Sequence, residues 1–190
     1  MAHDHPALPE GTRALVITVS DGVAAGTRDD DSGDALSGHL RPLGFAVDRA
    51  VVPDEQPAIE AAISVGVRDH ALIVTTGGTG LTPRDVTPQA TLAVIDYEVP
   101  GLAEAIRAYG RSKTPMADLS RGVVGVLAGS LIVNVPGSPR AALESLEALE
   151  PTLHHALETL GGPFDHDAAG AGGASRPDLP DPELPGPGLS

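Results

Sequence analysis

The sequence contains no cysteine, so neither a disulfide nor a thiolate metal site can hold the fold together. Aromatic residues make up only 2% of the chain, and the stacking platforms that bind single-stranded nucleic acid are therefore missing. No stretch approaches the roughly 18 to 20 apolar residues of a membrane span, and the N-terminus lacks the basic and apolar regions of a signal peptide. We therefore expect a cytoplasmic protein with no membrane partner.

Positive charge is also scarce, because 12 Lys and Arg residues stand against 26 Asp and Glu residues, a formal charge of -14. Such a surface repels a phosphate backbone, so nucleic acid is not an expected partner. A small anionic ligand is compatible with this charge if backbone N–H groups, a few local cations and a metal ion bind it.

One domain with two tails is the expected organisation of 190 residues with an apolar fraction of 41%. Residues 1–12 are interrupted by proline and glycine, which predicts a flexible segment. Residues 162–190 are rich in Pro, Gly and Ala, which predicts a disordered tail. The functional body is expected at residues 13–161.

Alternating strand and helix patterns in this body predict an α/β fold. Ala14 to Ser20 and Ala71 to Thr76 have the apolar, β-branched composition of strands buried on both faces of a parallel sheet. Val123 to Leu127 and Leu131 to Val135 predict a hairpin joined by Ala128-Gly129-Ser130. The expected architecture is a three-layer sandwich with a central, mainly parallel sheet and one antiparallel edge.

Apolar spacing and capping signals predict the other elements. They are helices at Ser32 to Leu43 (ending at Gly44), Pro57 to Val67, Thr87 to Ile95 (with Thr87 as N-cap), Leu102 to Tyr109 and from Ser138 onward, and a strand at Phe45 to Val52. The leucine stripe from Leu143 to Leu160 in the last helix indicates core packing.

The stretch TTGGTGLTPRDVTPQAT, Thr75 to Thr91, places a glycine loop between a buried strand and a helix. Its loop residues are Thr76, Gly77, Gly78, Thr79 and Gly80. Glycines allow close backbone approach, so successive N–H groups can converge on a phosphate. The stretch matches neither GxxxxGK[ST] nor GxGxxG, and a tight turn without a ligand is the alternative interpretation.

Two aspartates follow strands of the predicted parallel sheet. Asp54 comes after Pro53 at the end of the second strand, and Asp85 follows the glycine loop. Both carboxylates are expected at the carboxyl edge of the sheet, where open α/β folds bind ligands, and the pair could hold magnesium. Alternatively, Asp54 is the N-cap of the next helix and Asp85 a turn residue.

Two further junctions between a strand and a helix carry polar residues. In the first, Asn134 to Pro139, Ser138 is predicted to cap the last helix, and the helix N-terminus offers another phosphate site. In the second, Ser20-Asp21-Gly22 leads into Gly26 to Gly33, which is either a mobile flap or a plain surface loop.

Two other kinds of site are not expected. The adjacent His154 and His155 point in different directions on a helix, which argues against a histidine metal centre. No GxSxG elbow is present, which argues against a serine hydrolase.

Together, VSDG, TTGGTGLTPRDVTP and NVPGSP resemble the family of bacterial molybdopterin adenylyltransferases, over about Arg13 to Leu160. VPDE around Asp54 and the pair Ser120-Arg121 add support. The resemblance implies a molybdopterin-binding-domain-like fold in a homotrimer or hexamer. It also implies an enzyme of molybdenum cofactor biosynthesis that uses ATP and magnesium to attach AMP to molybdopterin, releasing pyrophosphate, with the molybdate-insertion protein as a possible partner.

By the same resemblance, Asp54 and Asp85 would hold magnesium and orient the triphosphate, while Thr76 to Gly80 would cradle its phosphates. The rest of the nucleotide and pterin pocket would be lined by Ser20, Asp21, Ser120, Asn134, Pro136, Gly137 and Ser138. Three alternatives stay open: a non-catalytic molybdopterin-binding member of the family, a molybdate-insertion factor, and a more distant competence-damage-type nucleotide hydrolase domain.

Overall fold

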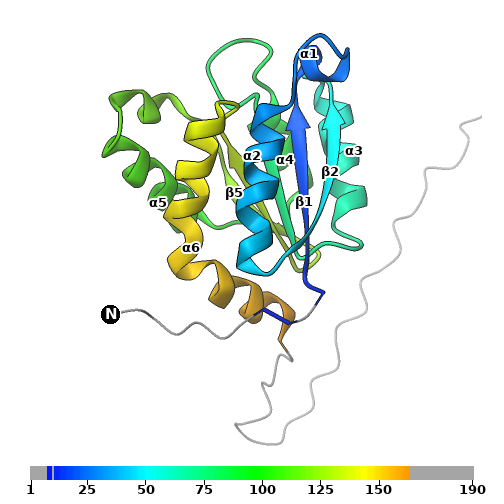
Figure 1. Cartoon of the computed structure of the whole chain (residues 1–190), viewed down its shortest axis with the longest axis vertical. Coiled ribbons are helices and arrows are strands. Elements are labelled where there is room, and N and C mark those ends of the chain that lie inside the picture. Colours follow the sequence, from blue (N-terminus) through cyan, green and yellow to red (C-terminus); the bar gives the residue numbers. More distant parts are fainter. Residues whose placement is uncertain (1–7, 10, 163–190) are drawn as a thin grey trace, which may run out of the picture.

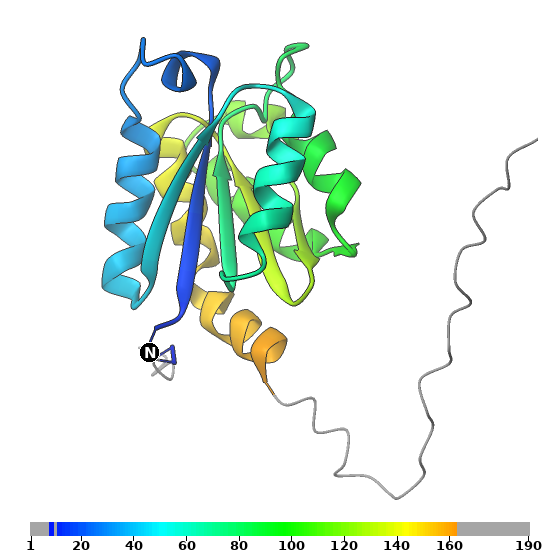
Figure 2. The same cartoon turned by 90° about the vertical axis from the view of Figure 1, so that its right-hand side faces the viewer.

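The computed structural model describes residues 8–9 and 11–162. The tail predicted at residues 162–190 therefore lies, beyond its first residue, outside the described residues. The described residues form a six-stranded sheet in the order β2-β1-β3-β6-β5-β4. Helices cover both faces of this sheet (Figures 1 and 2). The predicted three-layer α/β architecture is confirmed.

The parallel part of the sheet consists of four strands. β1 (Arg13–Val19) pairs in parallel with β2 (Ala46–Val52) on one side and with β3 (Leu72–Thr76) on the other. β3 in turn pairs in parallel with β6 (Ser130–Val135). Every residue of β3 and β6 is buried, as expected for strands covered on both faces.

The other edge of the sheet is antiparallel, as predicted. β5 (Val124–Leu127) pairs with β6 and with β4 (Tyr97–Glu98). The turn before β6 is Ala128-Gly129, and both residues have positive φ, 51° and 84°, as a two-residue hairpin turn requires. The predicted three-residue connection is one residue too long, because Ser130 already belongs to β6.

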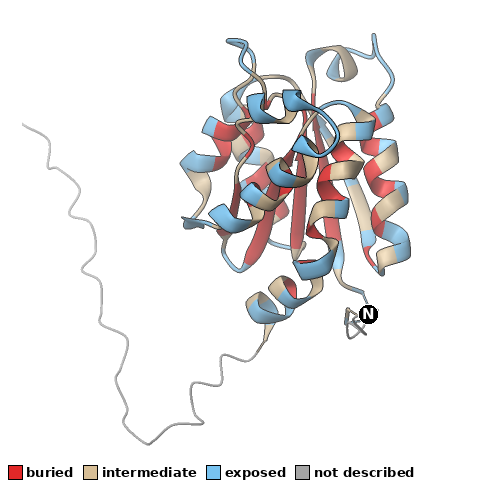
Figure 3. Cartoon of the chain, turned by 90° about the vertical axis from the view of Figure 1, so that its left-hand side faces the viewer, coloured by how far each residue is buried: buried red, intermediate tan, exposed pale blue. Residues whose placement is uncertain are grey.

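The longer helices are divided between the two faces. One face is covered by α2 (Asp31–Leu40), α5 (Pro100–Arg111) and α6 (Pro139–Gly161), and the other by α3 (Gln56–Gly66) and α4 (Thr87–Val94). A hydrophobic cluster fills the space between the sheet and the helices on each face. Figure 3 shows the buried residues concentrated in the sheet and on the inner sides of the helices. Within α6, Leu146, Leu149, Leu153 and Leu157 are buried, which confirms the middle of the predicted core stripe, whereas Leu143 and Leu160 at its ends are partly buried. Within residues 8–9 and 11–162, no helix is long and apolar enough to cross a membrane.

Short elements complete the structure. α1 (Asp21–Ala24) lies at the carboxyl edge of the sheet, and the 3-10 turns are η1 (Arg41–Leu43) and η2 (Pro115–Leu119). Gly44 follows η1 with a φ of 99°, which confirms the predicted left-handed cap.

The segment predicted as a loop from Gly26 to Gly33 is shorter than expected. The carboxylate of Asp30 accepts a hydrogen bond from the N–H of Gly33 at 3.0 Å and caps α2. Because this cap starts the helix at Asp31, Gly33 is a buried helical residue and not part of a flap. The loop proper ends at Asp30.

The path of the chain creates a switch point between β1 and β3. The chain passes from β1 to β2 through α2 on one face and from β2 to β3 through α3 on the other. In the sheet, β2 lies on one side of the β1–β3 pair and β4 on the other, so the chain leaves β1 and β3 in opposite directions along the sheet. Open α/β sheets bind ligands at the carboxyl ends of strands at such a point.

Candidate functional site

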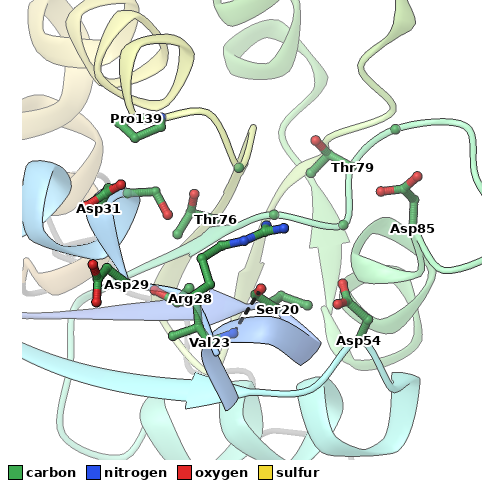
Figure 4. A pocket seen from close by; sticks show the side chains of 17 residues that line it. Ser20, Val23, Arg28, Asp29, Asp31, Asp54, Thr76, Thr79, Asp85 and Pro139 are labelled. Carbon is green, nitrogen blue, oxygen red and sulfur yellow. Dashed lines mark hydrogen bonds between the residues drawn. The ribbon is translucent and has the colours of Figure 1, made fainter. Parts of the chain in front are cut away.

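A cavity of about 460 Å³ lies at this switch point. It is lined by the whole glycine loop, residues 76–80, together with Ser20, Asp54, Asp85 and Gly137, all of which the sequence predicted for the site. Figure 4 shows Asp54 and Asp85 on the same side of the cavity, next to the glycine loop. The structure therefore brings together the two aspartates and the predicted phosphate cradle.

The glycine loop has a backbone that only glycine adopts easily. Gly77 and Gly78 have φ angles of 102° and 62°, and a side chain at Gly77 would collide with the carbonyl oxygen of Val19. The N–H of Gly77 donates to the carbonyl oxygen of Val135 at 3.2 Å. Within residues 8–9 and 11–162, the next two N–H groups, of Gly78 and Thr79, have no acceptor. Two backbone donors are thus available to a ligand.

Thr87, at the start of α4, stabilises the glycine loop by two hydrogen bonds. Its hydroxyl donates to the carbonyl oxygen of Gly77 at 2.8 Å, and its N–H donates to that of Gly78 at 3.1 Å. Thr87 is the first residue of α4, and Val86 occupies the N-cap position. The prediction that Thr87 caps the helix is therefore wrong, because its side chain stabilises the loop instead.

Arg121 also stabilises the glycine loop, through hydrogen bonds to its carbonyl oxygens. Its N–H donates to the carbonyl oxygen of Thr79 at 3.0 Å, and its Nε donates to that of Gly80 at 2.7 Å. A second guanidinium nitrogen contacts the carbonyl oxygen of Asp85. The sequence indicated Arg121 only as part of a motif, since these contacts join segments 36 and 41 residues apart.

Asp54 has a partner that local sequence did not reveal. Its Oδ2 accepts a hydrogen bond from the N–H of Asp21 at 2.8 Å, while Oδ1 faces Gly78, where an added Cβ would lie 3.5 Å away. Glu55 is the N-cap of α3. The alternative interpretation of Asp54 as a helix cap is therefore wrong.

Asp85 combines a turn role with a place in the cavity lining. Its Oδ2 accepts a hydrogen bond from the N–H of Thr82 at 2.7 Å, which agrees with its interpretation as a turn residue. Burial raises the pKa of the carboxyl group, but hydrogen bonds from Thr82 and Gly80 and the charge of Arg121 outweigh it and leave the pKa below its usual value. Asp85 is consequently ionised at neutral pH.

Asp21 does not line the cavity. Its Oδ1 accepts a hydrogen bond from the N–H of Asp54 at 3.0 Å, and its Oδ2 pairs with Arg84. The bond from Asp54, followed by that from Arg84, lowers the pKa of Asp21 below its usual value. Asp21 was predicted to line the nucleotide pocket, whereas here it supports Asp54.

Asn134 is likewise placed differently from the prediction. It is 2% exposed, its amide nitrogen donates to the hydroxyls of Thr75 and Thr91 at 2.9 Å, and its amide oxygen accepts from the N–H of Val123 at 3.3 Å. Asn134 lines neither this cavity nor the one beside it. Its side chain links β6 to β3 and α4 through these hydrogen bonds.

A second cavity of about 280 Å³ adjoins the first and shares Thr79 and Gly80 with it. Its lining includes the predicted site residues Ser120 and Pro136 and apolar side chains such as Ile106, Met116 and Leu119. The lining also includes the polar side chains Arg107, Glu144 and Ser145, so the cavity can hold a ligand with both apolar and polar groups. One predicted residue, Ser138, is exposed, lines neither cavity, and occupies the N-cap of α6 without a side-chain hydrogen bond.

The side chains of the first cavity are better suited to magnesium than to a metal ion whose ligands all come from the protein. In the described part of the chain, no three His, Cys, Asp or Glu side chains are grouped so that they could hold a metal ion. Asp54 and Asp85 line one cavity beside free backbone donors. Magnesium is typically bound by one or two carboxylates, substrate phosphates and water, and two carboxylates in one cavity are compatible with that donor set.

Comparisons with known proteins find relatives that share one family. A family model described as a probable molybdopterin binding domain matches residues 15–155. The chain is 44% identical over 158 residues to the molybdenum cofactor biosynthesis bifunctional protein of Synechococcus elongatus, with 82% of this chain and 49% of that protein covered. The chain thus spans about half the length of that relative.

Other relatives match over most of their length. The chain is 41% identical over 140 residues to the molybdopterin adenylyltransferase of Haemophilus influenzae, and the match covers 71% of each protein. The crystal structure of the molybdopterin biosynthesis enzyme MoaB from Thermus thermophilus has a TM-score of 0.74 and 47% identity, covering 80% of this chain and 99% of that one.

Proposed function

The chain belongs to the molybdopterin-binding domain family, and from this premise we propose that it is a molybdopterin adenylyltransferase of molybdenum cofactor biosynthesis. In the proposed reaction, an oxygen of the terminal phosphate of molybdopterin attacks the α-phosphorus of ATP. A new P–O bond forms, the bond between the α- and β-phosphates breaks, and pyrophosphate leaves. The products are adenylyl-molybdopterin and pyrophosphate.

One observation carries this proposal: two cavities of different character meet at the glycine loop. The larger cavity offers carboxylates and the unpaired N–H groups of Gly78 and Thr79, which suit a triphosphate with its metal ion. The smaller cavity combines apolar side chains such as Ile106 and Met116, which can cover the faces of a pterin ring, with polar ones such as Glu144, which can bond its polar edge. Because Thr79 and Gly80 line both cavities, two ligands bound in them would meet at this loop.

Asp54 and Asp85 would hold the magnesium ion in this proposal. Magnesium held there would neutralise the negative charge on the phosphate oxygens, which otherwise repels the attacking phosphate. The loop N–H groups orient the phosphates, and Thr87 and Arg121 keep the loop in place. No protein base is required, because the attacking phosphate monoester is largely ionised at neutral pH.

We also propose a homotrimer or hexamer located in the cytoplasm, which passes its product to a molybdate-insertion protein. Large apolar side chains are exposed on the single chain, among them Leu81, Leu92 and Tyr97, and contact between subunits would cover such groups. Light scattering should give a mass that is a multiple of 19.2 kDa. A monomer at micromolar concentration would contradict the proposed assembly.

The decisive experiment incubates the purified chain with ATP, magnesium and molybdopterin and separates the products. Transfer of AMP with one pyrophosphate released per AMP supports the proposal. Binding of molybdopterin without transfer would indicate a non-catalytic family member. Metal insertion without AMP transfer would indicate an insertion factor, and ATP hydrolysis alone would indicate a nucleotide hydrolase. A boiled sample serves as the control for uncatalysed hydrolysis.

A further inference from the structure

Arg28 brings the single positive charge to the lining of the larger cavity, in the part of the chain that the structure describes. The acidic residues in the same lining are Asp29, Asp31, Asp54 and Asp85. A polyphosphate entering this cavity meets electrostatic repulsion from these carboxylates. The position of the one guanidinium therefore matters for any anionic ligand.

Other arginines at this edge of the sheet are already bound within the protein. Arg84 pairs with Asp21, Arg49 pairs with two acids at the start of α2, and Arg121 donates to backbone carbonyls of the glycine loop. Arg28, by contrast, has neither an ion pair nor a side-chain hydrogen bond with any residue of 8–9 and 11–162. Its guanidinium donors are thus available to a ligand.

The base of the Arg28 side chain is nevertheless held in place. The N–H groups of Thr27 and Arg28 both donate to the carbonyl oxygen of Gly22, at 2.9 and 3.1 Å, and the hydroxyl of Thr27 donates to the same oxygen at 3.0 Å. Figure 4 shows the side chain extending from this loop into the cavity between Ser20 and Thr76, with its guanidinium directed toward the glycine loop. The backbone is fixed, and the charged end points inward.

We propose that Arg28 binds the polyphosphate of the nucleotide, together with the free N–H groups of Gly78 and Thr79. The identity of the nucleotide rests on the proposed function, whereas the phosphate chemistry rests on the cavity itself. A guanidinium presents five donors in a planar fork that matches two phosphate oxygens at once. A lysine at this position supplies the charge but not the fork.

Calorimetric titration with inorganic pyrophosphate plus magnesium tests this role, with adenosine as the uncharged comparison. Arg28→Gln should weaken pyrophosphate binding by about tenfold to a hundredfold, because a hydrogen-bonded charge pair is lost. Arg28→Lys should fall between wild type and Arg28→Gln. Arg68→Gln is the matched control, since it removes the same charge from an exposed residue just after α3, away from the cavity lining. Adenosine binding should stay unchanged in all variants.

Equal pyrophosphate affinity in Arg28→Gln and Arg68→Gln overturns the proposal, as does a wild-type chain that does not bind pyrophosphate. Circular dichroism checks the fold of each variant. Failure of the proposed function gives a different result: the wild type would bind pyrophosphate through Arg28 yet transfer no AMP to molybdopterin. Conversely, normal AMP transfer with an unchanged KM for ATP in Arg28→Gln would overturn the role of Arg28 alone.

Discussion

Asp21 and Asp54 hold each other through a reciprocal pair of hydrogen bonds. The carboxylate of Asp54 accepts from the N–H of Asp21 at 2.8 Å, and the carboxylate of Asp21 accepts from the N–H of Asp54 at 3.0 Å. The pair joins the end of β1 to the end of β2, 33 residues apart in sequence. The N–H of Asp21 orients the Asp54 carboxylate, and the carboxylate of Asp21 anchors the backbone of Asp54 beside the glycine loop, so Asp21 acts as a positioning residue.

Removal of Asp21 should therefore weaken the use of magnesium more than the binding of molybdopterin. In Asp21→Ala, we expect the magnesium concentration for half-maximal AMP transfer to rise by up to about tenfold. The hydrogen bond that anchors the Asp54 backbone is lost, while the N–H of residue 21 still donates to the Asp54 carboxylate. Arg84→Ala, which leaves the reciprocal bonds in place, should have a smaller effect. Magnesium titrations of activity measure both, and equal requirements in wild type and Asp21→Ala would contradict the positioning role.

Substitution of either carboxylate in the cavity should remove most of the activity. Asp54→Asn and Asp85→Asn keep the size of the side chain and an oxygen that accepts hydrogen bonds, so the turn at Thr82 can persist. Loss of the charge should slow AMP transfer by about a hundredfold or more. The measurement is AMP transfer, with circular dichroism and molybdopterin affinity as controls. Near-normal turnover in either variant would show that the residue has only a structural role.

Thr87 should stabilise the loop through its hydroxyl and not through its size. Thr87→Val keeps the shape but leaves the carbonyl oxygen of Gly77 without its 2.8 Å partner, which should lower the free energy of unfolding by about 1–3 kcal/mol. Thr87→Ser keeps the hydroxyl and loses a methyl group, at a cost of about 1 kcal/mol. Urea unfolding measures stability in both variants.

The affinity for pyrophosphate distinguishes an effect on the conformation of the glycine loop from an effect on the stability of the whole fold. It should fall in Thr87→Val and stay near the wild-type value in Thr87→Ser. An equal fall in both variants would show that the volume of the side chain, and not its hydroxyl, determines the shape of the loop.

Acid should destabilise this edge of the sheet in part through Asp85. Its pKa in the folded chain lies below the ordinary value of about 3.9, so the carboxylate contributes stability that is complete above this value and is lost as the pH falls through the lower folded-state pKa. Asp85→Asn cannot titrate at this position. Urea unfolding between neutral pH and about pH 3 should therefore show a smaller acid loss for the variant than for the wild type. Parallel curves would contradict the contribution of Asp85.

Much of the fold and the centre of the site could be predicted from local patterns. Local sequence predicted the buried strands β1 and β3, the left-handed Gly44 and the buried leucines of α6. Strands buried on both faces and a helix end with positive φ each require particular residue types. The same holds for the glycine loop, since Gly77 and Gly78 adopt a backbone that other residues avoid.

What local patterns could not decide is which side chains face the cavity. Asn134 lies near the end of β6 and Asp21 just after β1, both positions where ligand-binding residues occur in open α/β sheets. Their polar groups instead form hydrogen bonds with Thr75, Thr91, Asp54 and Arg84. These partners lie 33 to 63 residues away in the sequence.

The chain alone therefore predicted the α/β layers and the glycine loop, because these depend on residues close in sequence, and it indicated Asp54 and Asp85 as candidates by their places after predicted strands. The tertiary structure decided that Thr87 and Arg121 support the loop, that Asp21 orients Asp54, and that the guanidinium of Arg28 has no partner within the described residues. Each of these roles depends on hydrogen-bonding groups that only packing of the sheet and its helices brings within reach.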